Sequence, residues 1–189
     1  MCFLFENIKV NLVEQSISGI FLHTPVQYKD ERGDFLKTFH RSLFGEAGIK
    51  FEPKEEFLSR STRGVIRGMH FQLPPAAHQK LIYCIQGKVL DVCLDLRKQS
   101  TTFGKTIAFE LSPQKPQVLF LPVGIAHGFL SLEINSCLIY KTDHEYCPNL
   151  DVGIRYDSFG FSWPQTVAPY VISDRDKGHQ KFADFETPF

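Results

Sequence analysis

The sequence predicts an all-β sandwich or barrel, and three observations support this prediction. In several short runs, apolar and polar residues alternate with a period of two, as they do in half-buried strands. Turn signals separate these runs at intervals of about 8–12 residues. No stretch carries the apolar period of a long helix. Many short strands without long helices are typical of a sheet sandwich or a closed barrel.

The first part of the chain predicts strands and one short helix. Strands are expected where Ile, Phe, Val and Thr gather, over residues 17–25, 34–40, 57–61 and 65–72. The polar run from Lys29 to Gly33 is expected to form the turn between the first two strands. Residues 42–48 allow one or two helical turns before Gly48 ends them.

The middle of the chain predicts a β-hairpin followed by further strands. The arms of this hairpin are residues 80–86 and 89–96, joined by a turn at Gly87 and Lys88. Along the second arm, apolar residues alternate with acidic residues such as Asp91, so they are expected to face opposite sides. Later strands are expected over residues 105–111, 117–121, 126–132 and 136–142.

The length of the chain, 189 residues, suits one domain with a full core, so residues 1–189 are predicted to form a single domain. The polar stretch over residues 173–185 is expected to form an irregular or partly helical tail on the barrel. Hydrophobic residues make up 43% of the chain and aromatic residues 13%, which excludes a disordered protein.

The charge balance excludes two classes of partner. Twenty-one basic and 21 acidic residues give a formal net charge of +0, and no long block of like charge occurs. A nucleic-acid-binding protein needs a concentrated basic surface, so no nucleic acid is expected as a partner. A membrane-spanning helix needs ~20 apolar residues in a row, and no run approaches this length, so no membrane partner is expected.

The cysteines predict a reducing compartment. The chain has 5 Cys, an odd number, and no two are spaced as C-x-x-C. Three of them fall in apolar runs, so they are expected to be reduced and buried. The first residues lack the basic start and long apolar centre of a signal peptide. These features predict a cytoplasmic protein.

Residues 63–72 combine features that suggest an anion-binding pocket. Arg63 and Arg67 are each followed by glycine, and His70 comes shortly after them. Glycine within a strand marks a bend or a close approach to the backbone, and arginine offers a planar fork of donors to phosphate. An ordinary β-bend with solvated arginines is the alternative for this segment taken alone.

Two motifs resemble those of the cupin superfamily of small β-barrels, one spaced as Gly64, His70, Gln72, Lys80 and Gly87, the other as Pro122, Gly124 and His127. In metal-binding cupins these motifs supply His and Glu ligands. Here Gln72 stands at one His position and Lys80 stands near the acidic position. Because an ammonium group disfavours a divalent cation, no metal ion and no other cofactor is expected.

A longer ordered set of motifs resembles the dTDP-4-dehydrorhamnose 3,5-epimerase family. The set covers nearly the whole chain and comprises His70-Phe71-Gln72, Leu94-Asp95-Leu96-Arg97, Thr102-Phe103-Gly104, residues 121–129, Leu138-Ile139-Tyr140-Lys141 and Gly160-Phe161-Ser162-Trp163-Pro164. The resemblance implies a cupin-like jelly-roll barrel. It also implies epimerisation at carbons 3 and 5 of a nucleotide-linked 4-keto-6-deoxyhexose, most simply dTDP-4-dehydro-6-deoxyglucose.

The same resemblance implies four catalytic residues. His70 matches the family's general base, and Asp176 matches the carboxylate that bonds this histidine. Tyr140 matches the acid on the other face of the sugar, and Lys80 matches the lysine near the enolate oxygen. Such a reaction needs a base, an acid and positive charge at the developing enolate.

The resemblance also implies residues that bind the nucleotide sugar. Arg67 matches an arginine near the sugar and diphosphate, and Arg63 is a weaker phosphate candidate. Gln72 and His127 match pocket residues. Glu145 stands where many members carry a tyrosine that stacks on thymine, which predicts different recognition of the base.

A homodimer is implied as well, because N-terminal strands cross to a second subunit in this family. Arg32 matches a nucleotide-contacting arginine in the crossing segment, and Phe35 is expected to line the same region.

Four alternative functions stay open at this point. One is a C3-only or C5-only epimerase, or an epimerase of a CDP-sugar. A second is a 3,4-ketoisomerase, which moves the carbonyl group instead of inverting a centre. A third is a non-catalytic cupin that binds a sugar nucleotide, and a fourth is a metal-dependent cupin oxygenase.

Overall fold

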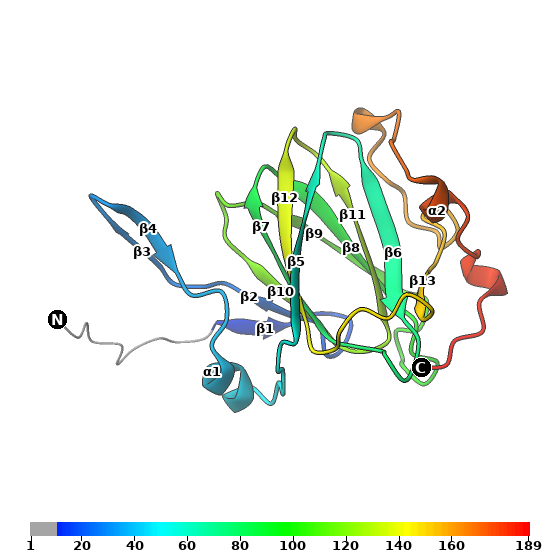
Figure 1. Cartoon of the computed structure of the whole chain (residues 1–189), viewed down its shortest axis with the longest axis horizontal. Helices are drawn as coiled ribbons and strands as arrows, with labels where there is room; N and C mark the ends of the chain where they lie inside the picture. The colour runs from blue at the N-terminus through cyan, green and yellow to red at the C-terminus, as the bar shows by residue number, and fades with distance from the viewer. Residues whose placement is uncertain (1–10) are drawn as a thin grey trace.

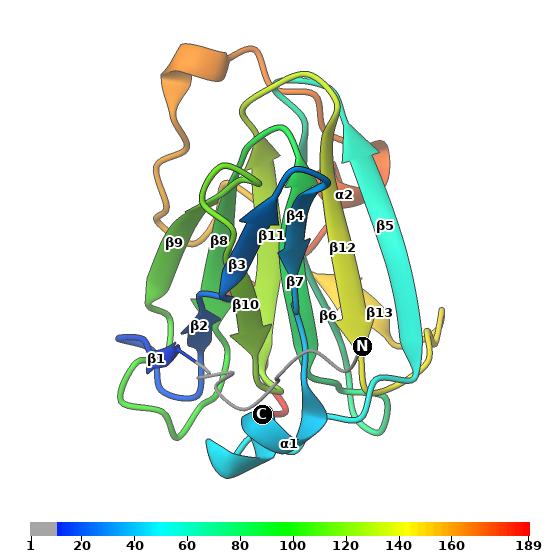
Figure 2. The same ribbon diagram turned by 90° about the vertical axis from the view of Figure 1, so that its left-hand side faces the viewer.

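Two antiparallel sheets face each other and form a cupin-like jelly roll (Figures 1 and 2). The computed structural model describes residues 11–189. The first sheet has six strands, in the order β1 (Leu12–Glu14), β2 (Phe21–His23), β10 (Val118–Leu121), β7 (Lys80–Gln86), β12 (Ser136–Thr142) and β5 (Glu55–Ser61). The second has five strands, in the order β13 (Asp151–Gly153), β6 (Ile66–Gln72), β11 (Ile125–Ser131), β8 (Val89–Asp95) and β9 (Thr106–Leu111).

Most of the strands predicted after residue 55 are confirmed, but the predicted hairpin is wrong. Strands β7 and β8 lie in different sheets, and β7 pairs with β10 and β12 instead. The link through Gly87 therefore crosses from one sheet to the other. Gly87 has a φ of +71°, and a Cβ there would lie 2.8 Å from the Cα of Ser136. A glycine turn with strands on both sides fits a corner of a sandwich as well as a hairpin, so the sequence pattern did not distinguish them.

The N-terminal predictions are correct only in part. Strand β2 occupies three residues of the predicted strand over 17–25, and β4 (Gly33–Leu36) begins the one over 34–40. Strand β3 (Gln27–Asp30) covers part of the predicted turn and pairs with β4. The predicted short helix is confirmed as α1 (Arg41–Glu46).

The two-stranded β3–β4 hairpin, here called the arm, projects from the barrel (Figure 1). The rings of Tyr28 and Phe35 lie 6.3 Å apart, and the two residues are 50% and 52% exposed. Because the arm has only two strands, it has no core of its own in which these large apolar side chains could be buried.

The second sheet is covered on both faces. Its inner face contributes to the core between the sheets, and its outer face packs under the segment that follows β13, including Phe159 and Trp163. Both faces of β8 are therefore buried. Leu94 on one face packs against that segment, and Asp91, which alternates with it, is also fully buried. The C-terminal segment contains η1 (Gln165–Val167), α2 (Asp174–Lys177) and η2 (Phe182–Asp184), so the predicted partly helical tail is confirmed.

The cysteine prediction is confirmed for the described residues. Cys84, Cys93 and Cys137 are free and buried, and Cys147 is free and partly buried. Cys2 and the start of the chain, on which the signal-peptide prediction rested, lie outside the described residues. Among residues 11–189, no helix combines the length and apolar character needed to cross a membrane.

Candidate active site

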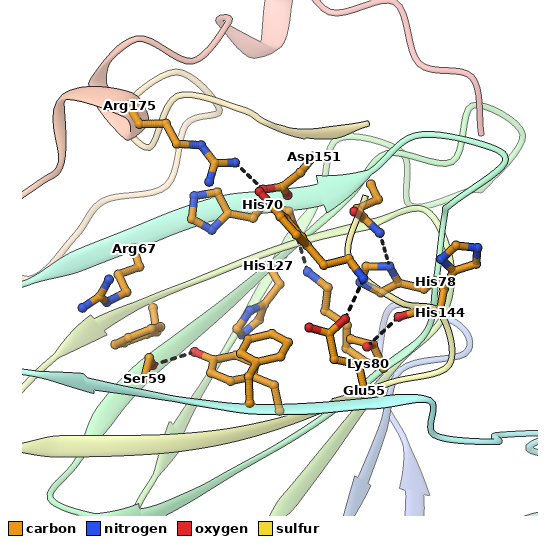
Figure 3. Close-up of a pocket in the computed structure, with 16 residues that line it drawn as sticks. Glu55, Ser59, Arg67, His70, His78, Lys80, His127, His144, Asp151 and Arg175 are labelled. Carbon is orange, nitrogen blue, oxygen red and sulfur yellow. Dashed lines mark hydrogen bonds and ion pairs between the residues drawn. The ribbon is translucent and has the colours of Figure 1, made fainter. Parts of the chain in front are cut away.

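A cavity of about 410 Å³ opens between the two sheets, and the strands β5, β6, β7, β11 and β12 supply most of its walls (Figure 3). This volume suits a small organic ligand. Six of the residues predicted from the sequence line the cavity, namely Arg67, His70, Gln72, Lys80, His127 and Tyr140. Others that line it were not predicted, among them Ser59, His78, His144, Tyr146, Asp151 and Arg175.

His70 and Asp176 form a hydrogen-bonded pair at the wall of this cavity. Nε2 of His70 donates to Oδ1 of Asp176 over 2.9 Å, and the backbone N–H of Gly68 donates to Oδ2 over 3.1 Å. The hydroxyl oxygen of Ser173 caps α2 by accepting from the N–H of Asp176, which fixes this residue at the start of the helix. A carboxylate 106 residues away in sequence therefore bonds the predicted base.

The protonation states of this pair suit a general base. Burial would raise the pKa of Asp176, but the nearby imidazoles of His179 and His70 and the N–H of Gly68 hold it well below its usual range. Burial lowers the pKa of His70, and this effect exceeds the opposing influence of Asp176. His70 is therefore neutral at pH 7 beside a carboxylate anion, and its Nδ1 is the ring nitrogen left to face the cavity.

Gly68 allows the backbone of β6 to approach β11 closely. Its φ is +135°, and a Cβ there would lie 2.5 Å from the Cα of Gly128 on β11. The same pairing of β6 with β11 sets His70 directly opposite His127. The glycine that interrupts the apolar pattern of β6 thus brings two histidines together.

Tyr140 lies on β12, in the sheet opposite His70. Its ring stacks on Phe57 at 4.8 Å and meets the ring of His127 edge-on at 5.9 Å. Its hydroxyl lies 3.3 Å from Oγ of Ser59 (Figure 3). Burial raises the pKa of Tyr140, so the hydroxyl stays protonated and able to donate.

Lys80 supplies positive charge beside the base. Its Nζ donates to the backbone oxygen of His70 over 3.1 Å. Burial lowers the pKa of Lys80 to about 8, against an opposing effect of Asp151. The ammonium group is therefore still mostly charged at pH 7. Asp151 itself pairs with Nη2 of Arg175 at 2.5 Å, so this carboxylate already has a cationic partner (Figure 3).

His127 and Arg67 are each held by a neighbour. Nε2 of His127 donates over 2.7 Å to Oδ2 of Asp91, which is fully buried. Sequence reasoning did not assign Asp91 a role, although an aspartate in a core strand was a usable signal, since a buried charge needs a partner. Arg67 is exposed as a residue, and its Nε donates to Oγ of Ser61 over 3.0 Å and its Nη2 to the backbone oxygen of Arg60 over 3.3 Å.

Gln72 holds two loops at one end of the cavity. Its Oε1 accepts from the N–H of Cys147 over 2.6 Å, and its Nε2 donates to the backbone oxygen of Ala76 over 3.1 Å. The same Nε2 lies 3.0 Å from Nδ1 of His78. Burial lowers the pKa of His78 to about 4, so this imidazole is neutral.

Four predicted binding residues lie apart from the cavity lining. Arg63 is exposed, and its Nη2 donates to the backbone oxygen of Thr166. Arg32 and Phe35 belong to the arm, which projects from the barrel, and Arg32 pairs there with Asp30. Glu145 is exposed and does not line the cavity, whereas the next residue, Tyr146, does.

Comparison with known proteins identifies the family. The model of the dTDP-4-dehydrorhamnose 3,5-epimerase family matches residues 14–184. The chain belongs to this family. The matched span includes both sheets, the cavity and the His70–Asp176 pair, so the resemblance expected from the sequence is confirmed over almost all of the chain.

Similar members of the dTDP-4-dehydrorhamnose 3,5-epimerase family come from distant organisms. The chain is 39% identical over 178 residues to the epimerase of Shigella flexneri, covering 93% of this chain and 97% of the relative. It is 38% identical to the epimerase of Methanothermobacter thermautotrophicus, covering 87% of this chain and 90% of the relative.

Solved structures of epimerases share the fold. The Legionella pneumophila dTDP-6-deoxy-D-glucose-3,5-epimerase, solved in complex with dTDP-4-keto-L-rhamnose, has a TM-score of 0.88 and 30% identity, over 94% of this chain and 95% of that one. A 3'-monoepimerase of Streptomyces bikiniensis in complex with dTDP-quinovose has a TM-score of 0.85 and 29% identity, over 90% and 87% of the two chains. Structures similar to this one have thus been solved with dTDP-sugars bound.

Proposed function

We propose that this protein epimerises carbons 3 and 5 of a dTDP-linked 4-keto-6-deoxyhexose, most simply dTDP-4-dehydro-6-deoxyglucose. The observation that supports this most directly is the neutral His70, bonded to the anionic Asp176, on one wall of a cavity with Tyr140 on the other. Among the relatives, the Shigella flexneri and Methanothermobacter proteins carry this activity in their names.

Four residues in or beside the cavity have a part in this reaction. His70 removes the proton at carbon 3, and the electron pair moves into the 4-keto group to form an enolate. Asp176 stabilises the imidazolium that results. The ammonium of Lys80 stabilises the enolate oxygen, and Tyr140 returns a proton to carbon 3 on the opposite face. The same sequence at carbon 5 completes the double inversion without a metal ion or other cofactor.

Arg67 suits the substrate's diphosphate. The residue borders the cavity and is exposed, and arginine binds phosphate oxygens through paired donors. Gln72 and His127 shape the cavity through their hydrogen bonds to neighbouring chain segments, while Arg63 and Glu145 are weaker candidates because their side chains lie outside the cavity lining.

Inversion of carbon 3 alone is the second candidate function. The similarity to a 3'-monoepimerase favours it, since both outcomes arise on closely similar folds. A 3,4-ketoisomerase and a non-catalytic binding protein fit less well. The ketoisomerase must protonate the enolate elsewhere, and a binding protein has no need of a buried base with a dedicated carboxylate.

Incubation with dTDP-4-keto-6-deoxyglucose in deuterated water is expected to place deuterium at carbons 3 and 5, because protons removed by His70 are replaced from solvent. Nuclear magnetic resonance of the sugar measures both positions. The same sugar linked to CDP is the control, and faster exchange on CDP would assign a different nucleotide. Deuterium at carbon 3 only would establish the monoepimerase, and exchange at neither position would contradict the proposed activity.

We also propose that residues 1–189 form one domain that assembles as a homodimer by exchanging the arm. The half-exposed Tyr28 and Phe35 rings support this, since a second barrel would bury them. In that assembly Arg32 and Phe35 would reach the partner's cavity and contact the nucleotide. The free cysteines among the described residues support a reducing compartment, the cytoplasm, as the site of the reaction.

Replacing both Tyr28 and Phe35 with aspartate is expected to convert the dimer to a monomer, because charged side chains would have to be buried in the interface. Light scattering coupled to gel filtration measures the mass. Ile134→Asp is the matched control, since Ile134 is 69% exposed on a turn of the barrel and lies outside the arm. A wild-type protein that elutes as a monomer would contradict the exchange.

A further inference from the structure

Behind the cavity, a third side chain shares the carboxylate of Asp176. Nε2 of His179 lies 3.5 Å from Oδ1 of Asp176, and His70 bonds the same oxygen at 2.9 Å. The two imidazole rings stand edge to face, with centroids 5.4 Å apart. Neither Asp176 nor His179 lines the cavity, so these two residues contact His70 from outside the cavity lining.

Nε2 of His179 is buried and has no hydrogen-bond partner among the described residues. Its side chain is 10% exposed, and 3.5 Å is too long for a hydrogen bond from this ring nitrogen to Asp176. A buried polar atom in this state needs an explanation, and an ion that binds there is one of the ordinary ones.

Gly153 makes room for this imidazole. A Cβ on Gly153 would lie 2.5 Å from Nε2 of His179, so any other residue at this position would displace the ring. Gly153 also pairs directly with His70 across strands β13 and β6. The absence of a side chain at 153 thus brings the second histidine to the carboxylate beside the first.

We propose that His70, Asp176 and His179 form an inhibitory site for a transition-metal dication of the zinc type. The donor set is two imidazole nitrogens and one carboxylate oxygen, and the three ligand atoms lie within 4.8 Å of one another. Bonds of ~2.1 Å in a tetrahedral site place neighbouring ligand atoms roughly 3.4 Å apart, close to the 2.9 and 3.5 Å seen here. The site differs from the interior site of metal-binding cupins, where Lys80 now stands.

The ligand types select the metal. Two imidazoles favour zinc, cobalt, nickel and copper ions, whereas magnesium and calcium prefer oxygen ligands. The ion would act as an inhibitor. Its bond to Nε2 of His70 takes the place of the hydrogen bond to Asp176, and the proton of the neutral ring then resides on Nδ1. His70 then has no lone pair facing the cavity with which to remove a proton. This consequence depends on the proposed function, whereas the binding of the metal does not.

Titration of the metal-free, full-length protein with zinc chloride in a calorimeter, without substrate, tests the site. One ion per chain is expected to bind. His179→Asn is expected to weaken binding by at least about 10- to 100-fold, since even supporting groups around a metal have effects of this size. His40→Asn is the matched control, because His40 is an exposed histidine at the start of α1 and is expected to leave zinc binding unchanged. The visible spectrum of added cobalt ions gives a second readout, whose tetrahedral signature should disappear with His179→Asn.

Equal zinc binding by the wild type and His179→Asn, or no binding by either, would overturn the site. Thermal melting without metal checks that the variant is folded, and His179→Gln serves as a second variant if it is not. In the deuterium-exchange assay at buffered zinc concentrations, each protein is compared with its own rate without zinc: the wild type should lose activity, and His179→Asn should keep its own rate. Zinc binding without loss of activity would overturn the inhibition alone. If the metal-free protein shows no epimerase activity, the calorimetry still decides whether the site exists.

Discussion

Replacing His70 with alanine is expected to abolish detectable deuterium exchange at both carbons, with a loss of at least about 10²–10⁴-fold, the usual contribution of a general base. The reason is geometric as well as chemical. His70 lines the cavity, and its Nε2 is bonded to the buried carboxylate of Asp176, which leaves Nδ1 to face the space for the sugar. Nuclear magnetic resonance of the recovered sugar measures the exchange.

Two variants in α2 distinguish a loss of activity at the base from a loss of folding. Asp176→Asn removes the charge that stabilises the imidazolium and is expected to slow exchange by about 10²-fold. Asp174→Asn is its matched control, two residues earlier in α2 with a fully exposed side chain. In His70→Ala the buried carboxylate of Asp176 loses the hydrogen bond from His70, which could itself reduce activity. His70→Asn keeps a donor for this carboxylate, so a loss of exchange in this variant comes from the missing base. Exchange at the wild-type rate in His70→Ala would assign the base to another residue.

Replacing Tyr140 with phenylalanine is expected to separate proton removal from inversion. The variant should still exchange the proton at carbon 3, because His70 is unchanged, but inverted product should form about 10²–10⁴-fold more slowly without the acid on the opposite face. The Tyr140 hydroxyl carries the proton that this role requires, since its pKa, raised by burial, lies well above pH 7. Comparing deuterium incorporation with the yield of inverted sugar measures the two steps on one sample.

Tyr83→Phe is the control for this experiment. Tyr83 lies on β7 and packs in a separate apolar cluster outside the cavity, so loss of its hydroxyl is expected to leave both steps unchanged. The stability cost of Tyr140→Phe should be about 1 kcal/mol, since one long hydrogen bond to Ser59 is lost. Equal slowing of exchange and inversion would contradict the assignment of Tyr140 as the acid.

The strands of the barrel were predictable because the alternation of apolar and polar residues is a local pattern along the chain. The predicted strands over residues 80–86 and 136–142 match β7 and β12 residue for residue. The pairing of strands was less predictable. Gly87 fixes a turn, but whether the chain returns in the same sheet depends on which distant strands complete the pairing of β7. Strand β13 has three residues and a weak apolar pattern, so its place beside β6 could only come from the folded chain.

The candidate site shows the same division. The sequence motifs singled out His70, Lys80 and Tyr140, and all three line one cavity. They did not pair Asp91 with His127, because the partner of a buried carboxylate is supplied by another strand. They also gave no sign of His179, which reaches Asp176 only because Gly153 leaves space for its ring.

The sequence by itself determined the fold class and the family and proposed which residues move protons, since period, turn chemistry and ordered motifs are written along the chain. The tertiary structure decided which of those residues meet. Burial then set their charge states, leaving His70 neutral, Asp176 anionic and the pKa of Lys80 at about 8. The physical reason is that hydrogen bonds and desolvation act over a few ångströms, and only folding brings side chains a hundred residues apart to that distance.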